Sequence, residues 1–464
     1  MENAQLFDAG NKGRGLRATK DLSAGDVVFS EPGFAAVVFD SMAANVCHNC
    51  FRRKSQLHRC AQCRFAYYCD RTCQTACWEE HRLECAAIRK IVTAPNQQVR
   101  LAARVMWRIH KETAIASDSQ LVAVDKLKDH VTDLGEEALK QLQANVSSFF
   151  DYWSSGSKKH SADYISHIFG IIKCNGFNLS DQHGLQAVGV GLFPNLCLVN
   201  HDCWPNCTVI LNNGKYVPVC LCRIELRALG KISEGQELTV SYVDYLNLSA
   251  DRQKMLKGRY FFECTCDHCT QHTKDDLMIA AAESKVSDHY FLSDCLYPML
   301  CKPMAVLSGD GRLCQVARLC CETLKKQENV LADTHLYKLR VLNSASEALS
   351  YLRCYSEAAD YARKMLDGYA KLYHPNSGQL GLAVMKAGVT HWHAGQIEHG
   401  HGLLCKAYSI LLITHGPNHA ITRDLESMRA QTEIELKMFK QNERENHAMR
   451  QEVLKDNSAA DKKI

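Results

Sequence analysis

Four close pairs of cysteine and histidine residues lie between positions 47 and 85, and they constrain the fold more than any other feature. The pairs are Cys47 and Cys50, Cys60 and Cys63, Cys69 and Cys73, and His81 and Cys85. Each pair can present two ligand atoms to one tetrahedral ion, so four pairs make two closed zinc sites. Because so short a segment cannot bury a sufficient core, metal binding must supply much of its folding free energy. The sequence therefore predicts a structural zinc module without a coordination position for substrate.

The whole chain is long enough for several domains. Its 464 residues suggest about two to four domains, and a hydrophobic fraction of 46% supports real cores. The net charge of +4 argues against phosphate-driven nucleic-acid binding as the main role. The first residues do not resemble a signal peptide, and a run of about 18 apolar residues is missing, so we expect a soluble intracellular protein. In a reducing compartment the 24 cysteines are expected to be zinc ligands and free thiols.

Two short motifs in the middle of the chain indicate a ligand site. Residues 200–207 read Asn-His-Asp-Cys-Trp-Pro-Asn-Cys, a composition that predicts a polar loop gripping a ligand. Residues 237–242 read Glu-Leu-Thr-Val-Ser-Tyr and predict a strand that ends in Tyr242. Taken alone, either motif is as compatible with a surface turn or a packed tyrosine as with a site.

A second group of cysteines connects to the first of these motifs. Cys264, Cys266 and Cys269 would leave a zinc ion one ligand short. Cys203, inside the first motif, would complete a four-sulfur site and tie this segment to the ligand loop. Free thiols in a polar tail are the alternative.

A glycine-containing segment near the N-terminus is a weaker signal. Gly13 allows a backbone turn around the polar end of a ligand, and Lys12 and Arg14 could meet a carboxylate. An ordinary basic hairpin fits the same residues.

Helical patterns dominate two other regions. Residues 101–107 and 124–142 have the spacing of amphipathic helices, and the chain from residue 271 onward is helical in pattern. Asp333, Pro375 and Pro417 each precede a predicted helix, with spacings of 375 − 333 = 42 and 417 − 375 = 42. This repeat predicts stacked helix pairs, with alanines such as Ala358 and Ala407 at close contacts. Residues 285–311 break the pattern and stay unassigned, and the histidines between 391 and 401 fit no standard metal spacing.

The residues described above, taken together, resemble the SET and MYND domain lysine methyltransferase family over nearly the whole chain. Residues 200–207 and 405–417 are most similar to its striated-muscle (skeletal and cardiac) branch. The resemblance implies an α+β protein with a split SET β-fold, an inserted MYND zinc finger, a cysteine-rich post-SET zinc site and a C-terminal all-α tetratricopeptide-like helical array. The implied boundaries are 1–46 for the N-terminal SET part, 47–85 for the finger, 86–160 for a helical insert, 161–246 for the core SET domain, 247–270 for the post-SET segment and 271–464 for the array.

The resemblance also implies transfer of a methyl group from S-adenosylmethionine to a lysine ε-amine, with Tyr242 as the catalytic residue. The implied cofactor-binding residues are Lys12, Gly13, Arg14, His130, Asn200, His201, Tyr260 and Phe262. Core packing is the alternative for Tyr260 and Phe262, and a ligand-free helix position is the alternative for His130. Three structural zinc ions are implied, held by Cys47, Cys50, Cys69 and Cys73, by Cys60, Cys63, His81 and Cys85, and by Cys203, Cys264, Cys266 and Cys269. Cys77 lies outside this spacing and is expected to be a buried thiol.

The partners and location are also expectations from the resemblance. The substrate would be a lysine in a histone tail or in a cytosolic or sarcomeric protein, with roles in transcription and myofibril assembly. Proline-rich peptides would bind the finger, chaperones and corepressors would be further partners, and direct DNA binding would be weak or missing. We expect the protein in cytoplasm and nucleus, without a membrane association. The alternative function is a scaffold of finger and helical array with weak catalysis.

Overall fold

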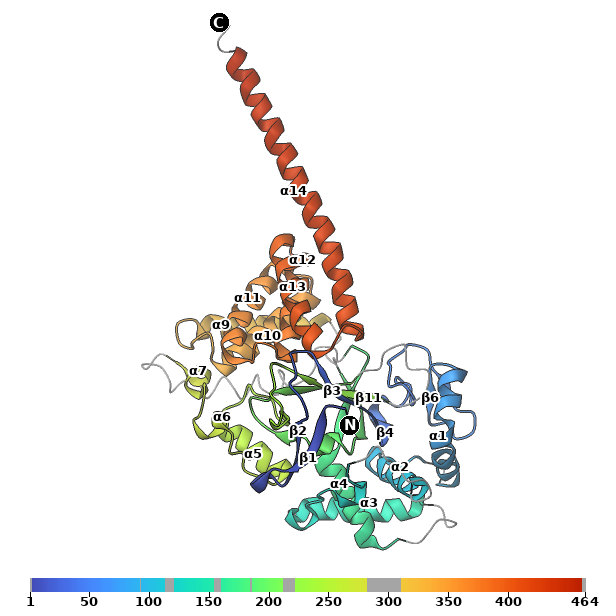
Figure 1. The fold of residues 1–464 in the computed structure, drawn as a ribbon. Coiled ribbons are helices and arrows are strands. Elements are labelled where there is room, and N and C mark those ends of the chain that lie inside the picture. The colour runs from blue at the N-terminus through green and yellow to red at the C-terminus, as the bar shows by residue number, and fades with distance from the viewer. Residues whose placement is uncertain are drawn as a thin grey trace. The chain divides into compact units, whose positions relative to one another are not determined.

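The computed structural model describes residues 2–91, 93–112, 121–153, 160–183, 186–211, 222–281 and 310–460. The chain forms two compact units: unit 1 comprises Met1–Thr273 and Ile413–Ile421, and unit 2 comprises Lys274–Leu412 and Thr422–Ile464. Figure 1 gives the elements of each unit. In the part of the chain that is described, no helix is both long and apolar enough to span a bilayer.

Unit 1 contains small β-sheets, two of which combine strands from before and after the finger. β1 pairs with β2 in a hairpin; a second sheet has the order β10-β11-β3, and a third has the order β4-β8-β7. The strands are β1 (Ala4–Asp8), β2 (Arg14–Ala18), β3 (Val27–Pro32), β4 (Ala35–Val38), β7 (Phe177–Ser180), β8 (Ala187–Leu192), β10 (Cys207–Leu211) and β11 (Arg223–Ala228). Because β3 and β4 are paired with strands from beyond residue 186, the β-fold is split by the inserted residues, as predicted.

The two central motifs lie side by side. β9 (Asn200–His201) pairs in parallel with β12 (Thr239–Val240), with Thr239 opposite Asn200 and Val240 opposite His201. The prediction of a polar loop at residues 200 and 201 is therefore wrong, because pairing with a distant strand overrides the local turn preference. Tyr242, predicted within a strand, lies two residues beyond the end of β12.

The finger and the helical insert complete unit 1. The finger holds β5 (His58–Arg59), β6 (Tyr67–Tyr68) and the first part of α1 (Arg71–Ile91), and its buried residues are mainly cysteines. In Figure 1, α2 (Gln97–Glu112), α3 (Glu136–Tyr152) and α4 (Ala162–Asn175) form a group of helices. Two short helices follow the core strands: α5 (Ser249–Tyr260) and α6 (Asp267–Thr270).

The prediction of one helix over residues 124–142 is wrong. Two 3-10 turns, η3 (Val124–Lys126) and η4 (Val131–Asp133), precede α3, which begins only at Glu136. His130 has a left-handed backbone with φ of 51°, and Gly135 has an extended backbone at the start of α3. These conformations break a continuous helix, although the apolar spacing of the segment remains.

Unit 2 is helical. Its elements are α7 (Asp275–Ile279), α9 (Asp310–Gln327), α10 (Leu336–Tyr351), α11 (Tyr355–Leu372), α12 (Gly378–His393), α13 (Ile397–Thr414) and α14 (Ala420–Ala460). The starts of α10, α12 and α14 are separated by 378 − 336 = 42 and 420 − 378 = 42 residues, which confirms the predicted repeat. Ala358, Ala359, Ala362 and Ala407 are buried as expected. The unassigned stretch 285–311 falls outside the described residues up to 309, and Asp310 and Gly311 begin α9.

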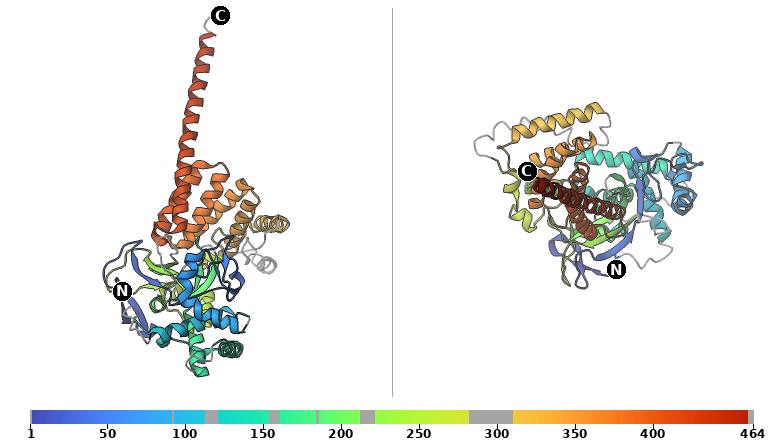
Figure 2. Two further views of the ribbon diagram at one scale, coloured as in Figure 1. Left: turned by 90° about the vertical axis from the view of Figure 1, so that its right-hand side faces the viewer. Right: turned by 90° about the horizontal axis from the view of Figure 1, so that it is seen from above.

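Two positions that are buried in α12 carry exposed acidic residues in α14. Buried Val384 and His391 of α12 correspond, 42 residues on, to exposed Glu426 and Glu433 of α14. The same helix also exposes the apolar residues Ile434, Met438 and Phe439, at 51%, 61% and 50%. Figure 2 shows α14 continuing past α12 and α13.

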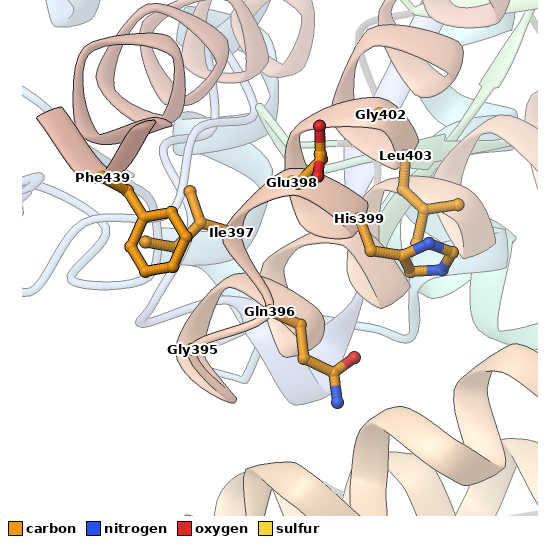
Figure 3. Close-up of a pocket in the computed structure, with 8 residues that line it drawn as sticks. All are labelled: Gly395, Gln396, Ile397, Glu398, His399, Gly402, Leu403 and Phe439. Carbon is orange, nitrogen blue, oxygen red and sulfur yellow. The ribbon is translucent and has the colours of Figure 1, made fainter. Parts of the chain in front are cut away.

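A hollow of about 640 Å³ lies in unit 2 where α13 begins beside α14 (Figure 3). The Phe439 ring, half exposed, lies next to the Ile397 side chain, and Lys440 pairs with Glu398 at 2.8 Å. The lining residues are Gly395, Gln396, Ile397, Glu398, His399, Gly402, Leu403 and Phe439. His391 and His393 lie in α12, and His399 and His401 lie in α13.

Candidate functional site

The structure brings the predicted finger ligands into two sets of four. One set is Cys47, Cys50, Cys69 and Cys73, and the other is Cys60, Cys63, His81 and Cys85. Within each set the ligand atoms lie within 4.8 Å of one another, and this donor chemistry fits tetrahedral zinc. The interleaved grouping is the one that the family resemblance implies. Cys77 belongs to neither set, and at 5% exposure it is the buried thiol that was expected.

A buried carboxylate orients the only histidine among these ligands. His81 Nδ1 lies 3.1 Å from Glu84 Oε2, which leaves Nε2 facing Cys63 Sγ at 3.5 Å. Arg104 donates to Glu84 at 2.6 Å and to the Ala36 carbonyl of β4 at 2.8 Å. Burial alone would raise the pKa of Glu84, but Arg104, His81 and Arg100 hold it well below its usual value. The carboxylate fixes the imidazole tautomer, and Arg104 connects it to β4.

A third set of four ligands forms around the first motif. Cys203, Cys264, Cys266 and Cys269 have sulfur atoms within 4.8 Å of one another, and Cys203 Sγ lies 3.3 Å from Cys269 Sγ. The fully buried Arg252 donates to Ser249 Oγ at 3.0 Å and lies 4.0 Å from Cys269 Sγ. Its positive charge would offset the negative charge that four thiolates carry when they hold zinc. Arg252 was not predicted as a site residue, because an arginine in a helix gives no local sign of burial.

Aromatic rings surround Tyr242. The ring centroid of Tyr242 lies 4.8 Å from that of Tyr260, 5.2 Å from His201 and 6.3 Å from Phe262. The Tyr242 hydroxyl donates to the Val199 carbonyl at 2.6 Å. Burial raises the pKa of Tyr242 above its usual value, so the phenol keeps its proton at neutral pH. The oxygen lone pairs then remain available for another contact.

Glu237 connects the N-terminal hairpin with Asn200 of β9. Lys12 Nζ pairs with Glu237 Oε2 at 2.8 Å, and Asn200 Nδ2 donates to Glu237 Oε1 at 2.9 Å. Asn200 Nδ2 would lie 2.8 Å from a Cβ at position 15, so Gly15 permits this close approach. Arg14 donates to the Lys126 carbonyl at 2.6 Å, and Gly13 has a φ of 75°. Glu237 was missed as a site residue, although it begins the second motif.

His130 lies against the segment that carries the two predicted aromatic residues. Its ring stacks on Phe261 with centroids 5.0 Å apart and planes 18° apart, and Nδ1 lies 2.9 Å from Asp133 Oδ2. Phe261 is the chain neighbour of both Tyr260 and Phe262. The predicted cofactor residues thus fall into a polar group around Glu237, an aromatic group around Tyr242 and His130 beside Phe261.

The His201 ring is engaged by the protein itself. Nδ1 accepts the Tyr242 backbone N–H at 2.9 Å, and Nε2 lies 3.3 Å from Cys203 Sγ. Burial lowers the pKa of His201 to about 4, so the ring is neutral at pH 7. Both ring nitrogens therefore have protein partners, and neither contact is evident from the sequence.

One further buried carboxyl group precedes the site. Glu31 of β3 is 5% exposed and accepts the backbone N–H groups of Asn195 at 2.9 Å and Leu196 at 3.0 Å, just before β9. Burial raises the pKa of Glu31 to about 7. Its position in an ordinary strand gave no sequence signal.

The chain is similar in sequence to known proteins along almost its whole length. The chain matches the SET domain family over residues 13–243. Histone-lysine N-methyltransferase Smyd1 of Mus musculus is 56% identical over 98% of this chain and 94% of that protein, and SMYD1 of Homo sapiens is 54% identical over the same shares. SMYD3 of Mus musculus is 32% identical over 91% of this chain and 95% of that protein.

The chain therefore belongs to the SMYD family of SET-domain lysine methyltransferases. Within that family, its similarity to the two SMYD1 proteins is higher than to SMYD3. A solved SET domain of LSMT, bound to lysine and AdoHcy, covers 94% of this chain and 88% of its own chain at 12% identity and a TM-score of 0.35.

Proposed function

We propose that this chain transfers methyl groups from S-adenosylmethionine to lysine side chains of proteins, including histones and cytosolic muscle proteins. The main support is the parallel pairing of β9 with β12, which sets Asn200 and His201 beside the segment leading to Tyr242. The SMYD1 relatives, named histone-lysine N-methyltransferases, support the same reaction and the histone substrate.

The aromatic group around Tyr242 can meet the chemical demands of this reaction. S-adenosylmethionine supplies a methyl group on a sulfonium, and this methyl passes to a neutral lysine nitrogen as the carbon–sulfur bond breaks. The rings of Tyr242, Tyr260 and Phe262 would desolvate the lysine ammonium and lower its pKa from about 10.4, which frees the lone pair. Because the Tyr242 proton is directed to Val199, the phenol oxygen can accept weak contacts from the methyl hydrogens. Tyr242 orients the reacting atoms, and the lysine proton leaves to water.

The polar group would hold the cofactor. Lys12, Gly13 and Arg14 would face its carboxylate, and Asn200 its adenosyl part, with Glu237 fixing the positions of Lys12 and Asn200. The positive φ of Gly13 supports a backbone turn around this polar end. His130 would contact the ribose from its position beside Phe261.

The test replaces Tyr242 by phenylalanine in the zinc-loaded protein. We expect Tyr242→Phe to bind S-adenosylmethionine with unchanged affinity in calorimetry and to transfer methyl groups about tenfold or more slowly, because one oriented oxygen is lost. The matched control is Tyr351→Phe, since Tyr351 is 60% exposed at the end of α10. Radiolabelled transfer is measured on histones and on a muscle cytosolic extract. A wild type that binds no cofactor would overturn the enzyme proposal and leave the scaffold function.

We also propose partner binding at two places. Trp78 and Leu83 of α1 are 43% and 39% exposed, which supports docking of proline-rich peptides on the finger at residues 47–85. The hollow beside Phe439 supports binding of chaperone or corepressor peptides by the array at residues 271–464. The formal charge of +4 supports little direct DNA binding. Such partners and substrates would place the protein in cytoplasm and nucleus.

A further inference from the structure

The His201 side chain lies between the four-cysteine set and the backbone of Tyr242. Its Nδ1 accepts the Tyr242 N–H at 2.9 Å, its Nε2 lies 3.3 Å from Cys203 Sγ, and the residue is 4% exposed. We propose that His201 is a positioning residue whose ring holds the Tyr242 backbone against the sulfur set and thereby fixes the place of the Tyr242 hydroxyl.

The partners determine which ring nitrogen carries the proton. A backbone N–H can only donate, so His201 Nδ1 is the acceptor and carries no hydrogen. A neutral imidazole then has its proton on Nε2, which donates to Cys203 Sγ. A thiolate that ligates zinc is a better acceptor than a thiol because it is negatively charged. The ring therefore makes two different contacts, and each can be removed separately.

The hydrogen bond to the His201 ring follows directly after the end of the β9–β12 pairing. β12 stops at Val240, which lies opposite His201, so the ladder does not extend to Tyr242. The His201 ring accepts the Tyr242 N–H instead, and the Val199 carbonyl accepts the Tyr242 hydroxyl at 2.6 Å. Val199 and His201 thus hold Tyr242 at two places, its hydroxyl and its backbone N–H. A shift of this backbone would misplace the hydroxyl without altering any residue of the polar group around Glu237.

Two replacements separate the contacts of the ring. His201→Asn puts an amide oxygen near the Nδ1 position, so it can keep the Tyr242 contact and lose the sulfur contact. His201→Gln puts an amide N–H near the Nε2 position, so it can keep the sulfur contact and lose the Tyr242 contact. For each variant, kcat, KM for S-adenosylmethionine and the rate of zinc transfer to a chromogenic chelator are measured.

We expect opposite results from the two variants. His201→Gln should lower kcat about tenfold, change KM little and release zinc at the wild-type rate, because one hydrogen bond to the tyrosine backbone is lost. His201→Asn should keep kcat close to wild type and release about one third of the zinc, the share of one site in three, several times faster. The matched control is His335→Asn, since His335 Nδ1 also accepts a backbone N–H, that of Tyr337 at 3.2 Å.

This inference rests on the proposed methyl transfer. Because zinc release can be measured without any methyl transfer, failure of the inference and failure of the proposed function can be told apart. Equal loss of kcat and equal zinc release in the Gln and Asn variants would overturn the inference. So would a His201→Gln variant with a raised KM and an unchanged kcat, because the ring would then serve cofactor binding. If one variant fails to fold, the other still tests its own contact against wild type.

Discussion

The buried carboxylate of Glu84 offers a sharp test of how the finger is attached to the β-fold. Glu84 is fully buried, and it accepts from Arg104 Nη2 at 2.6 Å and lies 3.1 Å from His81 Nδ1. A second buried cation, Arg100, has Nη1 3.9 Å from Glu84 Oε1. The change Glu84→Gln keeps the shape of the side chain and removes its charge, so two buried guanidinium groups lose a counter-ion.

The expected loss can be worked out from the remaining partners. Removing one member of a buried ion pair costs about 3–5 kcal/mol because the other charge stays buried. Arg100 would keep Asp40 at 2.6 Å, and Arg104 would keep Glu80 at 3.7 Å, which puts the expected loss near the lower limit, at about 3 kcal/mol. At about 2–4 °C for each kcal/mol, the unfolding transition of unit 1 should fall by about 6–12 °C.

Calorimetry of the zinc-loaded protein at pH 7 measures this shift. The pKa of Glu84 is depressed in the folded state, so its stabilising effect is present above the unfolded value of 4.5 and is complete at pH 7. The control is Glu79→Gln on the same helix, because Glu79 is 68% exposed and its ion pairs with Arg82 and Lys111 have distances of 4.0 and 3.7 Å. A Glu84→Gln transition within about 2 °C of the control would refute the reasoning.

The remaining predictions concern packing, pH and metal. Gly15→Ala would place a methyl group 2.8 Å from Asn200 Nδ2 and 2.9 Å from Phe7. Calorimetry should therefore show S-adenosylmethionine binding about tenfold weaker than in the wild type. The control variant Gly230→Ala has open space around the new methyl group and should bind with wild-type affinity. Folding raises the pKa of Glu31 from 4.5 to about 7, so the folded state binds the proton more tightly than the unfolded state. Between pH 4.5 and 7 the free energy of unfolding of the wild type, measured by denaturant titration, should therefore fall by about 3 kcal/mol relative to that of Glu31→Gln. Parallel pH curves for the two proteins would contradict this prediction. Removal of zinc by a chelator should open residues 47–85 to proteolysis and leave unit 2 helical by circular dichroism, and unchanged resistance of the finger would count against its dependence on metal.

Metal ligands and repeats were predictable from the sequence because their signals are local. The spacing of Cys60 and Cys63 fixes two sulfurs close together whatever the rest of the chain does, and a 42-residue period survives in the starts of α10, α12 and α14. Cys203 was found by counting ligands, since three cysteines leave a tetrahedral ion incomplete. Each of these inferences needs only the chemistry of neighbouring residues.

The errors and omissions come from contacts between distant parts of the chain. Residues 200 and 201 look like a turn until β12 supplies backbone partners, and the segment 124–142 keeps a helical period while His130 adopts a left-handed backbone. Glu84 and Arg252 carry charges that a sequence places on a surface. Glu84 is buried against Arg104 of α2, and Arg252 is buried beside the sulfur of Cys269. Pairing and burial of this kind depend on tertiary structure.

These long-range contacts bear directly on the proposed role of Tyr242. Tyr242 is held by Val199 at its hydroxyl and by His201 at its backbone, and neither contact follows from the tyrosine's own segment. Burial raises the pKa of Tyr242, so the phenol does not become a base as pH rises through the range in which a substrate lysine loses its proton. In the proposed mechanism Tyr242 therefore adds no titration of its own in this range, and it acts through its position. An enzyme that depends on position in this way needs a rigid support behind the tyrosine, and the sulfur set joined to it through His201 is built from short, buried contacts that can provide one.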